Sequence, residues 1–323
     1  DWGSAEKDQV LLDCLLNAKP QDLIEFDYSD FKHWNAAIDG ALIPDYPENL
    51  AGSRPKYPTL IGDMLEDYAF KIPGVQDGDL SNINNQTTLQ RLQYQWPNYD
   101  DETAKNMSQM MIDGYSNGEV PDDDDHLGWT QLNTQIFTGL LFDSNMIRDV
   151  QWHQKAGNED LWLFTFAHRS LLPFGVEIDG WIPVAHCAEL PYLWFYPDIW
   201  ETYNASDSDL AAADYLGALW AEFTTTGKIS LPRAGEAMNY IEIGEELTLR
   251  RNWRSIANVV YNEQFPAYLG EFPPLTISEE SWTKLNEVGS KIVTKWNSAA
   301  KCVAASTEPT TTKGESSISL IPY

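Results

Sequence analysis

Apolar and polar residues alternate along the chain in patterns that predict strands separated by helices. The apolar run YPTLIG at residues 57–62 ends in glycine and is typical of a buried strand. Residues 160–168, DLWLFTFAH, alternate and are rich in aromatic side chains, which also favours a strand. Residues 240–251, YIEIGEELTLRR, predict a strand or a hairpin. This alternation of strands with helices indicates an α/β architecture.

Several segments before, between and after these strands are predicted to be helical, the first of them amphipathic. In chain order, they are residues 5–18, 21–26, 100–115, 130–155, 207–226 and 255–269. Ser206 or Asp207 should cap the fifth of these helices, and Gly227 should end it. Pro266 should cut the sixth. A further amphipathic helix is predicted from Ser278, with an apolar face made by Trp282, Leu285, Val288, Ile292 and Trp296.

Charge excludes some classes of partner. The 49 acidic and 21 basic residues give a formal net charge of −28, so the chain should repel nucleic acid and anionic membranes. Such a field favours cations, which suits either a cationic substrate or simple solubility. No run of 18 apolar residues is present, so no transmembrane segment is predicted.

No metal or other cofactor is predicted from the sequence. The acidic run Asp122–Asp125 stands beside His126, but it lacks the alternating ligand spacing and the glycine of an EF-hand loop. No CxxC motif or Cys/His cluster has the spacing of a zinc site. A solvated surface loop is the better interpretation of the acidic run.

Cysteines and sequons bear on where the protein acts. The three cysteines, Cys14, Cys187 and Cys302, cannot all pair within one chain, so at least one is free or bonds outside it. Three Asn-X-Ser/Thr sequons favour a secreted or cell-surface glycoprotein. They are centred on Asn85, Asn106 and Asn204.

Four strings resemble one family, in its order and with its rough spacing. They are LLDCLLNAKPQDLIEF (Leu11–Phe26) followed by AAIDGALIPDYP, YPTLIGDMLEDYAF (Tyr57–Phe70), VAHCAELPYLW (Val184–Trp194) and ALWAEFTTTGKISLP (Ala218–Pro232). Together they make residues 8–270 similar to the type-B carboxylesterases and cholinesterases. The resemblance implies the C-terminal half of an α/β-hydrolase fold, with a mostly parallel sheet flanked by helices and completed by a missing N-terminal segment.

The resemblance also places two members of a catalytic triad. His186 matches the family's histidine in the string resembling "HGxELxYVF", and Asp67 matches the acid in the string resembling "LIGxxxDEG". Glu66 could serve as the acid if the turn is shifted by one residue. Phe70 falls where cholinesterases place an aromatic residue that lines the acyl and alcohol sites, and a core phenylalanine is the alternative.

The nucleophile of such an enzyme is missing from this sequence. No Gly-x-Ser-x-Gly elbow occurs anywhere in the 323 residues, and in the family this elbow and the oxyanion-hole glycines belong to the N-terminal half. We therefore expect an N-terminal partner made by cleavage of a longer precursor. The function that follows is a secreted serine esterase that hydrolyses small carboxylic esters through an acyl-enzyme. The alternative is a catalytically silent, cholinesterase-like adhesion or ligand-binding protein.

Three parts of this chain are predicted from the resemblance and the composition. Residues 1–275 should form the C-terminal part of the hydrolase domain, residues 276–304 an amphipathic helix, and residues 305–323 a flexible low-complexity tail. Cys14 matches a family cysteine whose partner would stand upstream. Either that partner lies outside this chain, or Cys14 is a free thiol.

The chain departs from the family pattern around the triad. Tyr68 and Cys187 replace the glycines that follow the acid and the histidine, which fits either an altered substrate range or lost catalysis. The arginine that pairs with a family aspartate appears as Arg254, and its partner position reads Asn133. A hydrogen bond between Arg254 and Asn133 is therefore expected in place of an ion pair.

Overall fold

The computed structural model describes residues 9–10, 13–14, 16–19, 21, 38, 41–72, 74–75, 78–97, 99–172 and 176–270. Residues 1–55 and 56–323 form two separate compact units. In the first unit, described residues between 9 and 17 are helical, and α3 (Pro47–Leu50) and η1 (Ala51–Ser53) follow. The helix predicted from Ser278 and the predicted domain boundaries at 275 and 304 lie outside the described residues.

A four-stranded sheet organises the second unit. Its strands are β1 (Thr59–Met64), β2 (Leu161–Phe166), β3 (Tyr240–Ile243) and β4 (Leu247–Arg250). They lie in the order β1-β2-β3-β4; β1, β2 and β3 are parallel, and β4 returns antiparallel to β3 as a hairpin. The first two predicted strands are confirmed, and of the two alternatives for residues 240–251 the hairpin is the one that forms.

Helical elements follow β1, β2 and β4, whereas β3 leads directly into β4. The helical elements are η2 (Ala69–Lys71), α4 (Asn85–Gln93), α5 (Asp101–Ser116), α6 (His126–Thr138), η3 (Gly139–Asp143), α7 (Ser144–Lys155), α8 (Leu190–Trp194), α9 (Pro197–Thr202), α10 (Asp207–Thr226), α11 (Ser255–Ala257), η4 (Asn258–Gln264) and α12 (Phe265–Leu269). None of the helices in the described part of the chain is long and apolar enough to cross a bilayer.

The predicted helix ends are set by local capping. The Ser206 side chain accepts a hydrogen bond from the Asp209 backbone N–H, the Asp209 carboxylate accepts one from the Ser206 N–H, and Gly227 ends α10 in the left-handed region at φ 67°. The acidic run has a similar use, because Asp125 caps α6 by accepting from the Gly128 N–H.

Two predicted helices contain π turns. The helix expected at 130–155 runs from α6 through the π segment η3 into α7 without a break. The helix expected at 255–269 contains the π segment η4. Pro266 does not cut this helix, contrary to the prediction, and the chain stays helical to Leu269. Pro266 lies in the first turn of α12, where a residue without an N–H is tolerated.

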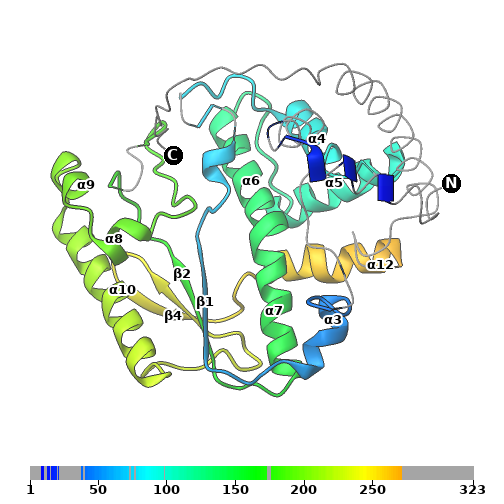
Figure 1. Ribbon diagram of the computed structural model, residues 1–323. Helices are drawn as coiled ribbons and strands as arrows, with labels where there is room; N and C mark the ends of the chain where they lie inside the picture. Colours follow the sequence, from blue (N-terminus) through cyan, green and yellow to red (C-terminus); the bar gives the residue numbers. More distant parts are fainter. Residues whose placement is uncertain are drawn as a thin grey trace, which may run out of the picture. The chain divides into compact units, whose positions relative to one another are not determined.

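Helices cover both faces of the sheet. In Figure 1, the sheet is seen from its β1 edge, with α8 and α10 on one side and α6 and α7 on the other. The strand β2 is buried at every position. Its odd-numbered residues Leu161 and Leu163 pack into the core below α6 and α7, whereas its even-numbered aromatic residues pack toward α10. Successive side chains of β2 therefore point alternately into two apolar cores, and neither face of this strand meets solvent.

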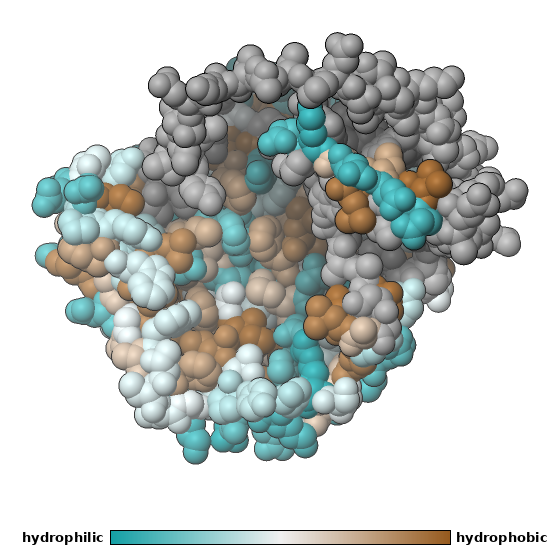
Figure 2. Space-filling view, viewed as in Figure 1, coloured by the Kyte–Doolittle hydropathy of each residue, from teal (hydrophilic) through white to brown (hydrophobic). Residues whose placement is uncertain are grey.

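The strand β1 is less buried than β2. Four of its six residues, Thr59 to Gly62, are only partly buried, because β1 has one neighbouring strand among the described residues. Leu60 and Ile61 pack toward opposite cores. Figure 2, in the same view, shows hydrophobic residues gathered on this face between the two helical layers. A strand with apolar side chains and one edge without a partner is suited to accept a further strand.

Gly62 should be the glycine on which the sheet depends most. A Cβ at Gly62 would overlap the ring of Phe164, its partner in the register, which is held edge-to-face against Trp220. We predict that Gly62→Ala lowers the free energy of unfolding by about 1–3 kcal/mol through overpacking. The measurement is urea unfolding followed by circular dichroism.

Gly217→Ala is the matched control for this substitution. Gly217 lies inside α10, and a Cβ there meets no atom within 4 Å. This variant should raise the free energy of unfolding by about 0.5–1 kcal/mol through helix propensity. Equal effects of the two substitutions would refute the packing argument for Gly62.

Candidate active site

The candidate site lies where two parallel strands end at one edge of the sheet. β1 ends at Met64 and β2 at Phe166, so the loops that follow them start side by side. Asp67 lies three residues beyond β1, and His186 lies in the loop after β2. Backbone hydrogen bonds tie these loops together, from the Glu66 N–H to the Val184 carbonyl (3.0 Å) and from the His186 N–H to the Asp67 carbonyl (3.1 Å).

The side chains of Asp67 and His186 are in direct contact. His186 Nδ1 lies 2.8 Å from Asp67 Oδ1, and the Met64 N–H donates to Asp67 Oδ2 at 3.0 Å. The Asp67 side chain is 4% exposed, whereas that of His186 is 48% exposed. An ionised Asp67 holds the proton of the neutral imidazole on Nδ1, which leaves Nε2 as the basic atom.

Several neighbours act on the ionisation of Asp67. Burial raises the pKa of Asp67 and is the largest influence. The hydrogen bonds from His186 and from the Met64 N–H lower this pKa, and the nearby Asp63 carboxylate raises it again. The net direction is upward. The hydrogen bonds thus oppose, without cancelling, the cost of burying the charge.

Glu66, the alternative acid, binds Arg169 and the Val184 backbone rather than His186. Its two carboxylate oxygens accept from Arg169 at 2.7 and 2.9 Å, and one of them also accepts from the Val184 N–H at 2.8 Å. Trp181 Nε1 adds a longer contact of 3.4 Å. Of the two carboxylates, only Asp67 has a hydrogen bond to His186 among the described contacts. Glu66 instead fixes the loop that carries His186.

Two aromatic rings flank the imidazole of His186. Phe70 is stacked on it with ring centroids 5.8 Å apart and an interplanar angle of 21°. Phe142 lies 5.2 Å away at 42°. Sequence reasoning considered Phe70 and missed Phe142, which comes from the π segment η3. No sequence signal marked Phe142. The π turn at η3 adds one residue to a helical turn, so the regular helix periodicity does not predict which residues of this segment face the site.

Cys187 adopts an unusual backbone conformation beside the dyad. Its φ is 67°, in the left-handed region where a side chain is strained, and the family pattern has glycine at this position. Cys187 has no disulfide partner among the described residues, and burial raises the pKa of its thiol, so the thiolate form is disfavoured. Cys14 is in no disulfide among the described residues either, and its predicted external partner stays a prediction.

The expected hydrogen bond between Arg254 and Asn133 is wrong. Asn133 donates instead to Thr88 Oγ1 at 2.6 Å and to the Trp129 carbonyl at 2.8 Å. Arg254 Nε donates to Asp63 Oδ2 at 2.6 Å and lies 3.6 Å from Asp143. A buried guanidinium interacts more strongly with carboxylates than with a neutral amide, so Asp63 takes the place of the missing acid.

The three sequon asparagines are all exposed. Asn85 is the first residue of α4, and Asn106 lies within α5, where its amide donates to the Tyr268 hydroxyl at 3.0 Å. Asn204 follows α9 in the left-handed region. Attachment of glycans at these positions stays a prediction.

Asp67 should make stability depend on pH. Because the folded-state pKa of Asp67 is raised, the contribution of Asp67 to stability falls as pH rises above about 4, where the unfolded-state carboxyl loses its proton, until pH passes the folded-state value. Asp67→Asn removes this titration. We predict that the free energy of unfolding of Asp67→Asn, measured by urea unfolding, rises relative to that of wild type as pH increases from 4 to neutral. A difference that is constant or that shrinks with pH would contradict the raised pKa.

Two of three comparisons with known proteins found matches. The model of the carboxylesterase family matches residues 2–263. No curated protein matches the chain. Among solved structures, a PNB esterase is similar over 77% of this chain and 49% of its own, with 18% identity and a TM-score of 0.50. The carboxylesterase EST55 of Geobacillus stearothermophilus is similar over 77% and 50%, with 14% identity and a TM-score of 0.56.

These comparisons settle the fold and the family. The chain spans about half the length of the two solved structures, and the similarity to them shows the α/β-hydrolase fold. The mostly parallel sheet flanked by helices confirms the fold class predicted from the sequence. The family model matches most of this chain, so this chain belongs to the carboxylesterase family.

Proposed function

We propose that this chain supplies the base and the orienting acid of a serine esterase that hydrolyses small carboxylic esters. One observation carries this proposal: the 2.8 Å contact between His186 Nδ1 and a buried Asp67 carboxylate at the strand ends. This is the arrangement that prepares an imidazole to deprotonate a hydroxyl. Membership of the carboxylesterase family supports the same reaction.

The proposed reaction passes through an acyl-enzyme. His186 Nε2 removes the proton from a serine hydroxyl while the serine oxygen attacks the ester carbonyl carbon. The resulting imidazolium returns this proton to the departing alkoxide, and the acyl group stays on the serine. A water molecule that gives its proton to the same Nε2 then attacks the acyl carbon. The carboxylic acid leaves, and the imidazolium returns the proton to the serine oxygen. Asp67 holds the imidazole in one tautomer and stabilises its charged form throughout.

The serine would come from a segment outside residues 1–323. No Gly-x-Ser-x-Gly elbow occurs in the sequence, and β1 has a partly buried, apolar edge with no strand paired to it among the described residues. A parallel strand beside β1 would end next to Asp67 and His186, because parallel strands present their carboxyl ends at one edge. We propose that this segment is the N-terminal half of the same precursor, with Cys14 bonded to it.

The surroundings of His186 suggest the shape of the ester site. Phe70 and Phe142 are both partly buried and lie against the imidazole, so they would border the bound acyl or alcohol group. The exposed sequons at Asn85, Asn106 and Asn204 support a secreted glycoprotein. No metal or other cofactor takes part in the proposed reaction.

The alternative is a catalytically silent family member used for adhesion or ligand binding. The strained backbone of Cys187, directly after His186, favours this alternative, since the family has glycine there. The residue at the serine position of the partner segment distinguishes the two functions. Serine supports the esterase, and alanine or glycine supports the silent protein.

Substitution of the dyad tests the esterase proposal. When the chain is coexpressed with its upstream segment, we predict that His186→Ala abolishes hydrolysis of a p-nitrophenyl ester. Asp67→Asn should lower kcat by about 10³–10⁴-fold, because the imidazole adopts the wrong tautomer. Glu66→Gln is the comparison variant. It weakens the fork with Arg169 but keeps an oxygen that can accept from the Val184 N–H, so it should lower kcat far less than Asp67→Asn.

A covalent probe gives an independent result. An organophosphate that phosphorylates activated serines should label the upstream segment of the wild-type complex, and His186→Ala should prevent the labelling. Hydrolysis retained in His186→Ala, or Glu66→Gln as damaging as Asp67→Asn, would remove the proposed roles of these residues.

A further inference from the structure

The turn that carries Asp67 needs external support. Residues 65–68 form a short turn between β1 and η2, and both Asp67 oxygens are already used, one on His186 and one on the Met64 N–H. A displacement of about 1 Å between catalytic groups is enough to cost much of their reactivity. The contacts that fix the backbone of this turn therefore decide whether the dyad is aligned.

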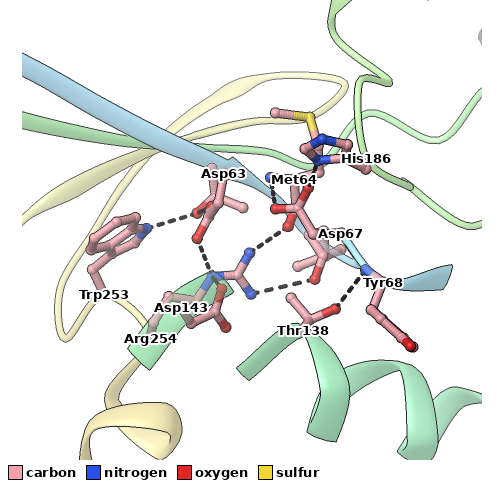
Figure 3. Close-up of polar contacts among 11 residues, drawn as sticks. Asp63, Met64, Asp67, Tyr68, Thr138, Asp143, His186, Trp253 and Arg254 are labelled. Carbon is pink, nitrogen blue, oxygen red and sulfur yellow. Dashed lines mark hydrogen bonds and ion pairs between the residues drawn. The ribbon is translucent and has the colours of Figure 1, made fainter. Parts of the chain in front are cut away.

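Arg254 reaches this turn from a distant part of the chain, just before α11. Its Nη2 donates to the Met64 carbonyl at 2.8 Å, its Nη1 donates to the Leu65 carbonyl at 3.3 Å, and its Nε donates to Asp63 Oδ2 at 2.6 Å. One guanidinium thus binds three successive residues at the end of β1 (Figure 3). The other end of the turn is held by α6, where Thr138 Oγ1 accepts from the Tyr68 N–H at 3.0 Å.

The guanidinium is itself held in place. Asp63 is fully buried, and its Oδ1 accepts from Thr165 Oγ1 at 2.7 Å, which in turn accepts from Trp253 Nε1 at 3.0 Å. Asp143, from η3, lies on another side of Arg254 at 3.6 Å. The backbone of Arg254 has φ 50°, in the left-handed region where a residue with a side chain is strained.

We propose that Arg254 is a positioning residue. By binding the carbonyls of Met64 and Leu65 it fixes the start of the 65–68 turn, so that Asp67 holds the imidazole of His186 in its Nδ1-protonated tautomer. The proposal rests on the proposed function of the dyad, and it concerns a residue that touches neither His186 nor an ester. A lysine could keep the charge near Asp63, but its single ammonium cannot reach all three acceptors in the directions of the planar guanidinium.

The test uses the imidazole tautomer of the full 323-residue chain. Nitrogen-15 NMR at mildly alkaline pH distinguishes an Nδ1-protonated from an Nε2-protonated ring. Wild type should show mainly the Nδ1-protonated form at His186. Arg254→Lys should shift His186 toward the tautomer mixture of a free imidazole, while circular dichroism shows a folded chain.

Arg250→Lys is the matched control. Arg250 pairs with Glu242 at 2.7 Å on the β3–β4 hairpin, and no described hydrogen bond or ion pair joins either residue to the Asp67 turn. This variant should keep the wild-type tautomer. Arg254→Lys with the wild-type tautomer would overturn the proposal, and so would the same change in both variants.

A second variant covers a failure of Arg254→Lys to fold. Asp63→Ala keeps Arg254 but removes the carboxylate that directs its guanidinium, so it should shift the His186 tautomer in the same direction. A folded Asp63→Ala chain with the wild-type tautomer would overturn the proposal.

Kinetics separate this proposal from the proposed esterase function. In the complex with the upstream segment, Arg254→Lys should lower kcat by about 10–100-fold and leave KM nearly unchanged. If the wild-type complex hydrolyses no ester, the proposed esterase function is wrong. The NMR measurement of the His186 tautomer still tests the role of Arg254 in that case. If wild type is active and Arg254→Lys matches it in kcat and tautomer, the role of Arg254 is refuted.

Discussion

Two loops that are 119 residues apart in sequence meet in the hydrogen bond between Asp67 and His186. This contact depends on the parallel pairing of β1 with β2, since parallel strands release their loops at the same edge of the sheet. It also depends on a buried carboxylate that keeps its place despite the cost of burial. The Met64 N–H and the imidazole bind the two oxygens of Asp67 and offset part of that cost.

One cation and three carboxylates lie close together around this contact: Arg254 with Asp63, Asp67 and Asp143. Burial alone would lower the pKa of Arg254, but Asp63 and Asp143 outweigh burial and raise it, so Arg254 stays charged. Burial raises the pKa of Asp143 well above its usual range, Arg254 opposes this, and Asp63 and Asp67 add to it.

The sequence predicted the strands, most helices and the dyad because each has a local signature. Ser206 and Gly227 mark the ends of α10 through capping chemistry, and the strings around Asp67 and His186 carry the family pattern. The partner of Arg254 was mispredicted, because Asp63 and Arg254 are 191 residues apart and only the folded sheet brings them together. Phe142 was missed because the π turn at η3 changes which helix face meets the site.

A crystal structure of the chain bound to its upstream segment tests the central claim most directly. We predict that a parallel strand of that segment pairs with the free edge of β1 and that a serine hydroxyl lies about 3 Å from His186 Nε2. A β1 edge that stays unpaired in the complex, or an Nε2 atom that faces no hydroxyl of the bound segment, would contradict the account.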